Sequence, residues 1–102
     1  MLGDADLPDW AEYYADSGVC LIAHNALWPG VLMVHLGVVP SAWGRTEKPI
    51  NRLLREIWRE HEPDRLIAWV AESNRAVVSL LTRLGWQRDG GFPGVLMYGW
   101  RL

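Results

Sequence analysis

The chain has 102 residues, half of them hydrophobic, which is enough for one compact core and too short for two ordinary domains. We therefore expect a single domain over residues 1–102. The formal net charge is −2, with basic and acidic residues interspersed, so the basic patch of a nucleic-acid-binding protein is missing. No apolar run approaches the roughly 20 residues that a membrane-spanning helix needs. We expect neither nucleic acid nor a membrane among the partners.

The N-terminus and the single cysteine bear on the compartment. Residues 1–16 contain five acidic side chains and no basic one, whereas a secretory signal begins with a positive region. Cys20 has no second cysteine to pair with, and its apolar neighbours favour a buried structural role over a nucleophilic one. Both features predict a reducing, cytoplasmic location.

The first segment, residues 7–17, is predicted to be helical. Its aromatic side chains fall at helical spacing behind a proline that suits a first helical turn. They are Trp10, Tyr13 and Tyr14. We expect a short N-terminal helical segment within residues 1–17, with its acidic side chains in solvent.

A hairpin is expected next. Residues 19–24 are a short apolar run, and the Asn, Pro and Gly of residues 25–30 are typical of a turn. Residues 31–39 are almost continuously apolar, as in a strand covered on both faces, and Pro40 ends the run. This second strand is predicted to be the centre of the sheet.

The firmest helical pattern extends from Thr46 to His61. One face carries apolar side chains at i, i+3, i+4, i+7 and i+8, namely Ile50, Leu53, Leu54, Ile57 and Trp58. Pro49 fits only the first turn, where a missing N–H breaks no hydrogen bond. Residues 66–71 are then predicted to form a second buried strand.

The last third is expected to contain one helix and a final strand. Asn74 is a good N-cap for a helix whose apolar face includes Leu80 and Leu84, and Gly85 is a natural C-terminal stop. Residues 86–94 are predicted to be a glycine-rich connection, and residues 95–102 a last strand.

Together these elements predict an α/β fold with a mixed sheet. The order is β-β-α-β-α-β-β or close to it, after the N-terminal helix. A strand, a helix and a strand in this length imply a right-handed parallel crossover, while the hairpins imply antiparallel neighbours.

Two segments, in this order and separated by one helix and one strand, resemble the GNAT (Gcn5-related) acyltransferases. Leu36–Gly37–Val38–Val39–Pro40 is similar to the L-x-V-x-P that leads into the family's motif A. The segment from Asn74 to Trp86 is similar to the motif B helix, N-x-x-A-x-x-L-Y-x-K-x-G-F. The resemblance covers about residues 19–102 and implies a minimal fold without the family's first strand and N-terminal helix pair.

The resemblance implies a cofactor-binding core over residues 31–86. In the family, coenzyme A enters between two strands that splay apart, which here end at Val39 and Glu72. Its pyrophosphate lies on the amides of the following loop, here Ser41–Lys48, and on the start of the next helix. The cofactor would be acetyl-CoA, and the implied binding residues are Val38, Val39, Trp43, Gly44, Arg45, Thr46 and Asn74.

The same comparison shows departures. The loop has large side chains where the family has small ones; Arg45 and Lys48 offer compensating charge, while Glu47 and the bulk of Trp43 oppose a phosphate. The tyrosine that often protonates the departing thiolate corresponds to Leu81, which leaves solvent or Tyr98 as the acid.

Glu72 and His35 are the candidate bases. Each has a structural alternative, since a histidine in an apolar strand is often a core residue and Glu72 is also consistent with a solvated strand end. His24 and His61 lack partners at metal-ligand spacing, so no metal site is expected. Asn74 is explained by helix capping alone.

Two functions remain open. One is an acyl-CoA-dependent N-acyltransferase acting on an amine. The other is a non-catalytic module that works through protein contacts or as a homodimer, with some of the seven tryptophans at the contact. The short pattern also resembles GNAT-like proteins of tailed bacteriophages, which implies an infected bacterial host or the virion as a location.

Overall fold

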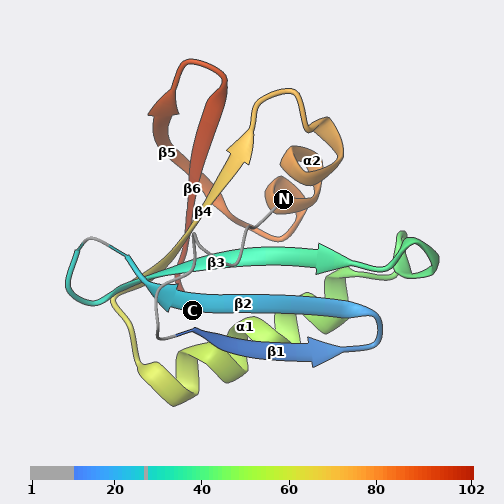
Figure 1. Cartoon of the computed structure of the whole chain (residues 1–102), viewed down its shortest axis with the longest axis horizontal. Coiled ribbons are helices and arrows are strands. Elements are labelled where there is room, and N and C mark those ends of the chain that lie inside the picture. The colour runs from blue at the N-terminus through green and yellow to red at the C-terminus, as the bar shows by residue number, and fades with distance from the viewer. Residues whose placement is uncertain (1–10, 27) are drawn as a thin grey trace.

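The computed structural model describes residues 11–26 and 28–102, in which six strands form one mixed sheet beside two helices (Figure 1). The strands are β1 (Glu12–Asp16), β2 (Val19–Asn25), β3 (Val31–Val38), β4 (Arg65–Ala71), β5 (Gln87–Phe92) and β6 (Val95–Trp100), and the helices are α1 (Glu47–His61) and α2 (Arg75–Arg83). The order across the sheet is β1-β2-β3-β4-β6-β5. Only β3 and β4 are parallel neighbours. The predicted mixed α/β fold is confirmed, including the hairpin β2–β3 and the crossover through α1.

Both helices pack on one face of the sheet. Leu21 of β2 and Leu66 of β4 share one core with Leu54 of α1 and Leu80 of α2, and each of these side chains is at most 2% exposed. Burying one such side chain contributes about 1.5–3 kcal/mol before entropy is subtracted. Figure 1 shows α1 behind β1 and β2. Neither described helix is long and apolar enough to cross a membrane.

The helix ends follow the local sequence. Thr46 precedes α1, and the buried Pro49 lies in its first turn as predicted. The Asn74 side chain caps α2 by accepting the Val77 N–H at 3.3 Å. Gly85, with φ of 86°, ends that helix in a left-handed conformation that glycine adopts at little cost.

The predicted N-terminal helix is wrong for the residues that the structure describes. Glu12–Asp16 form β1, which pairs antiparallel with β2. Tyr14 is 6% exposed and its neighbour Tyr13 is 65% exposed, which is the alternation of a strand. Two adjacent aromatic residues fit the period of a helix as well as that of a strand, so the sequence could not distinguish the two structures. The first part of that prediction, residues 7–10, lies outside the described residues.

The connection predicted for residues 86–94 is also wrong in part, because Gln87–Phe92 form the edge strand β5. All six residues of β5 are exposed and two of them are glycines, so no apolar alternation marks the strand in the sequence. Its glycines are required where they stand: Gly91 has a φ of 147°, and a Cβ there would lie 2.2 Å from the Val95 carbonyl oxygen. The strand therefore depends on backbone pairing with β6.

Candidate functional site

The parallel strands β3 and β4 separate partway along their length. Their pairing covers three residue pairs and ends at Met33 and Ile67. Beyond that point Val34–Val38 pairs only with β2, and Ala68–Ala71 only with β6. The facing edges therefore carry backbone N–H and C=O groups without a strand partner, and such groups favour a hydrogen-bonding ligand.

The opening was predicted just past Val39 and Glu72, and the structure places its start earlier, after Met33 and Ile67. Figure 1 shows β4 turning away from β3, with α2, β5 and β6 on one side of the opening and α1, β1 and β2 on the other. The opening therefore begins within the sheet, between β3 and β4, and not only past the ends of these strands.

A cavity of about 430 Å³ occupies this opening. Leu54 of α1 and Leu81 of α2 line it on the helix side, whereas His35 and Trp69 line it on the opposite face of the sheet. Since its lining comes from both faces, the cavity passes between the two strands. Most of the lining is apolar, and Asn74 adds an amide at the start of α2.

His35 is held by a second histidine on the neighbouring strand. Its Nε2 atom lies 2.7 Å from Nε2 of His24, and Nδ1 of His24 lies 2.9 Å from the Asn25 carbonyl oxygen. A carbonyl only accepts, so His24 carries its proton on Nδ1 and His35 donates from Nε2 when both rings are neutral. The nitrogen of His35 that can still accept a proton is therefore Nδ1. Sequence reasoning missed His24 as a partner because their contact depends on the β2–β3 register.

Burial, and secondly the charge of His24, hold the pKa of His35 below its usual value of 6.5. The ring is therefore mainly neutral at pH 7 and able to accept a proton. A half-buried neutral histidine at a cavity is a suitable general base.

The other predicted catalytic groups are not brought to the cavity. Glu72 is exposed beyond the end of β4, and its side chain does not line the cavity. Tyr98 is 6% exposed in the helix-side core and is not part of the lining either. Leu81 does line the cavity, at the position where the family resemblance implied a tyrosine. No acid thus accompanies His35 among the lining residues.

The predicted phosphate loop lies between β3 and α1. Gly44 has a φ of 90° with no atom within 4 Å of where a Cβ would be, so the backbone is open to a ligand there. Among the described residues, the amides of Gly44, Thr46, Glu47 and Lys48 have no backbone acceptor outside the helix. Amides without a backbone acceptor at the start of a helix favour an anion.

The side chains of this loop are placed less favourably. Trp43 is 45% exposed and Thr46 is buried at the helix start, and neither lines a cavity described for this region. Val39 and Arg45 line a separate hollow beside α1, where Arg45 donates to the Ser41 carbonyl oxygen at 3.0 Å. Val38 lies at the end of β3 and borders a third hollow with Val39. The predicted cofactor residues are thus divided between neighbouring surfaces.

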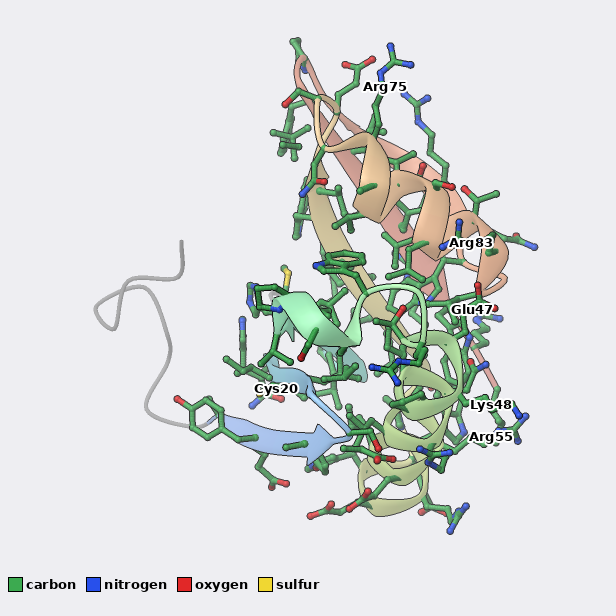
Figure 2. The ribbon with its side chains drawn as sticks, turned by 90° about the vertical axis from the view of Figure 1, so that its right-hand side faces the viewer. Cys20, Glu47, Lys48, Arg55, Arg75 and Arg83 are labelled. Atoms are coloured by element: carbon green, nitrogen blue, oxygen red, sulfur yellow. The ribbon has the colours of Figure 1, made fainter. Side chains whose placement is uncertain are left out.

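An ion pair joins the start of α1 to α2. Nε of Arg83 lies 3.0 Å from Oε1 of Glu47, and both side chains are about half exposed. Figure 2 shows Arg83 and Glu47 next to one another, while the side chain of Lys48 lies farther away, beside Arg55. A carboxylate therefore occupies part of the positive surface that an anionic ligand would use.

No family model matches this sequence, and no curated protein is similar to it in sequence. Solved structures nevertheless share its architecture. The N-acetyltransferase PseH from Campylobacter jejuni, determined in complex with acetyl coenzyme A, superposes with a TM-score of 0.70 at 13% identity, over 81% of this chain and 58% of that chain. An acetyltransferase of the GNAT family from Bacillus anthracis gives 0.68 at 16% identity, over 80% and 57%.

This is the GNAT acetyltransferase fold. The ribosomal-protein-S5-alanine acetyltransferase from Vibrio fischeri also matches, with a TM-score of 0.67 at 12% identity, over 80% of this chain and 52% of that chain. The family resemblance of the sequence is confirmed at the level of the fold. The chain spans a little over half the length of these acetyltransferases.

Proposed function

We propose that this chain is an acyl-CoA-dependent N-acyltransferase that binds the pantetheine arm between β3 and β4. The observation that carries the proposal is the cavity in the strand opening, bordered by unpaired strand edges and by the neutral His35. The GNAT fold supports it, since one neighbour, PseH, was determined with acetyl coenzyme A. Fold alone does not establish activity, so the site must be tested directly.

The residues that would hold acyl-CoA come from the core over residues 31–86. The free edges of Val34–Val38 and Ala68–Ala71 would hydrogen-bond the amide groups of pantetheine. The loop amides around Gly44 would receive the pyrophosphate, with Lys48 supplying charge. The strand half of the site fits this ligand well; the loop half fits it less well, because Glu47 adds a negative charge.

Acyl-CoA supplies a thioester, whose carbon–sulfur bond breaks as the amine forms a carbon–nitrogen bond. His35 accepts the proton of the attacking amine on Nδ1, and its Nε2–H stays bonded to His24. Leu81 lines the cavity and cannot donate a proton, so solvent would have to protonate a departing thiolate. We therefore expect slow turnover compared with an enzyme that has an acid at this position.

Thermal unfolding with and without acetyl-CoA tests cofactor binding. A ligand at about 100 times its dissociation constant stabilises the folded state by roughly 2.7 kcal/mol. In a domain of this size each kcal/mol raises the Tm by about 4–8 °C. We expect a saturable increase for the wild type, and none for Ala71→Trp, which places an indole at the cavity lining.

Ala15→Trp is the matched control, because Ala15 is exposed on β1 and does not line this cavity. Its response to acetyl-CoA should equal that of the wild type. Absence of any shift at millimolar acetyl-CoA would remove the acyltransferase proposal.

A second candidate function is a non-catalytic one, in which the fold presents a surface to a protein partner or to a second copy. Exposed aromatic side chains favour it: Tyr13 is 65% exposed, Phe92 66% and Trp28 49%. A phage accessory or virion-associated protein is the form that the sequence pattern suggests. This function predicts stable association, measured by light scattering, together with a Tm that acetyl-CoA does not change.

A further inference from the structure

A polar cluster joins β1 to the last turn of α1. The Tyr14 hydroxyl lies 2.6 Å from Oε2 of Glu12, 2.9 Å from Oε2 of Glu60 and 3.0 Å from Nε2 of His61. Nε2 of His61 is also 3.4 Å from Oε2 of Glu12. None of these four residues lines the cavity between β3 and β4. The cluster is therefore separate from the proposed acyl-CoA site.

The possible ligand atoms of the cluster lie close together. One ligand atom each from Glu12, Glu60 and His61 can be chosen so that all lie within 4.8 Å of one another. In a tetrahedral zinc site with bonds of about 2.0 Å, ligand atoms stand roughly 3.3 Å apart. Small side-chain rotations would bring the three atoms to that spacing, with the Tyr14 oxygen beside them as a fourth donor or a hydrogen-bond partner.

The two carboxylates of the cluster favour the binding of a cation. Tyr14 has a single hydroxyl proton for the two carboxylates of Glu12 and Glu60. Among the described residues, no arginine or lysine contacts the carboxylate of Glu12 or Glu60. Two adjacent carboxylates repel each other, and a positive charge between them relieves that repulsion. The imidazole of His61, 3.4 Å from Oε2 of Glu12, is the basic group that the cluster itself holds.

We propose that Glu12, Glu60 and His61 bind a divalent transition-metal ion, with Zn²⁺ as the best-fitting ion. An imidazole with two carboxylates is a donor set that Zn²⁺ accepts, whereas Mg²⁺ and Ca²⁺ prefer oxygen ligands alone. The ion would attach the edge strand β1 to the C-terminal end of α1. Glu12 stands 48 residues before Glu60 and 49 before His61 in the chain. The ion would thereby stabilise a small domain in the way that a structural metal does.

Sequence spacing gave no indication of such a site. The absence of a metal was expected because His61 has no partner at ligand spacing in the chain. The structure supplies Glu12 from a strand that the sequence had predicted to be a helix. A ligand set divided between β1 and α1 is visible only once those two elements are packed together.

The test is Zn²⁺ binding to chelator-treated protein, measured by calorimetry and by the Tm. We expect one Zn²⁺ per chain and a raised Tm, with no comparable response to Mg²⁺ or Ca²⁺. Glu60→Gln and His61→Gln should weaken binding by more than about 100-fold, because even changes in residues behind the ligands cost about 10- to 100-fold. Glu60 is exposed, so Glu60→Gln should fold even if His61→Gln does not.

Glu56→Gln is the matched control, since Glu56 is exposed one turn earlier on α1 and loses the same charge. His24→Gln tests the other two histidines of the chain, His24 and His35, whose Nε2 atoms lie 2.7 Å apart. Both variants should bind Zn²⁺ as the wild type does. No binding by the wild type, unchanged binding by Glu60→Gln, or loss of binding in His24→Gln would each overturn the proposal.

Discussion

The two halves of the proposed acyl-CoA site differ in how well they suit the ligand. In the strand half, β3 and β4 part after Met33 and Ile67, and the cavity between them is lined by His35. In the loop half, the backbone around Gly44 is open, but Glu47 pairs with Arg83 where an anion would lie. The strand half therefore offers both a cavity and a candidate base, while the loop half offers an open backbone without a favourable net charge.

This difference separates two requirements that acyl-CoA places on a protein. Pantetheine is neutral and needs backbone hydrogen bonds, which the splayed strands provide whatever their side chains are. The phosphates are anionic and need net positive charge, which depends on individual side chains. A chain can retain the first property and lose the second, so binding of the pantetheine arm and binding of the phosphates should be measured apart.

The largest expected effect comes from the base in the strand half. His35→Gln should lower the acyl-transfer rate by about 10²- to 10⁴-fold, the usual contribution of a general base. The dissociation constant for acetyl-CoA should change little, because the glutamine keeps the cavity filled. Steady-state transfer to an amine, with acetyl-CoA binding measured separately, tests this.

Glu72→Gln is the control for that experiment, since Glu72 is exposed and does not line the cavity. Its rate should equal that of the wild type; the reverse pattern, with Glu72 required and His35 dispensable, would assign the base to Glu72. Because the pKa of His35 is lowered, the wild-type rate should begin to fall only when the pH drops below 6.5. Stability should decline in the same range, as the unfolded chain binds the proton more readily than the folded one.

The sequence predicted the framework of the fold because buried elements carry periodic apolar patterns. The helix with Leu54 on its apolar face, the strand after it and the cap at Asn74 all stand where the pattern put them. The pattern failed at the sheet edges. Tyr13 and Tyr14 fit two periodicities, and β5 has no buried side chain to reveal it.

The candidate site was predictable only in part, for a related physical reason. His35 could be named as a candidate base from its place in a central strand, but its bond to His24 required the register of β2 and β3. The pair Glu47 and Arg83 required the packing of α2 beside α1. Contacts between elements distant in the chain leave no local pattern, so neither pair could be found from the sequence alone.

A smaller effect is expected when the loop half is made more favourable. Glu47→Gln removes a negative charge at the start of α1 and releases Arg83 for an anionic ligand. Since exposed ion pairs contribute little, acetyl-CoA affinity should rise by roughly two- to fivefold, and less at high salt. Calorimetry at two ionic strengths measures this. Glu56→Gln, with the same charge change further along α1, should not alter affinity; equal gains in both variants would mean that only net charge matters.

The smallest effect is expected at the edge of the loop half, where Asp16 on β1 accepts a hydrogen bond from Arg52 of α1 at 2.6 Å. Arg52 borders the same hollow as Arg45 and Lys48. The hydrogen bond from Arg52, and then that from Ser17, lowers the pKa of Asp16 below its usual 3.8. A lowered folded-state pKa means that the ionised Asp16 stabilises the chain above pH 3.8, and that this contribution is lost as the pH falls through the folded-state value.

Asp16→Asn should therefore give a slightly lower Tm than the wild type at pH 7, and the two Tm values should converge in acid. Thermal unfolding of both proteins between pH 7 and strongly acidic pH measures the difference. A gap between the two curves that persists in acid would show that Asp16 stabilises β1 by something other than its charge. The substitution also frees Arg52 beside the loop. A gain in acetyl-CoA affinity would mean that the phosphates bind on the side of α1 that carries Arg52. Unchanged affinity would mean that they bind only on the side facing Arg83.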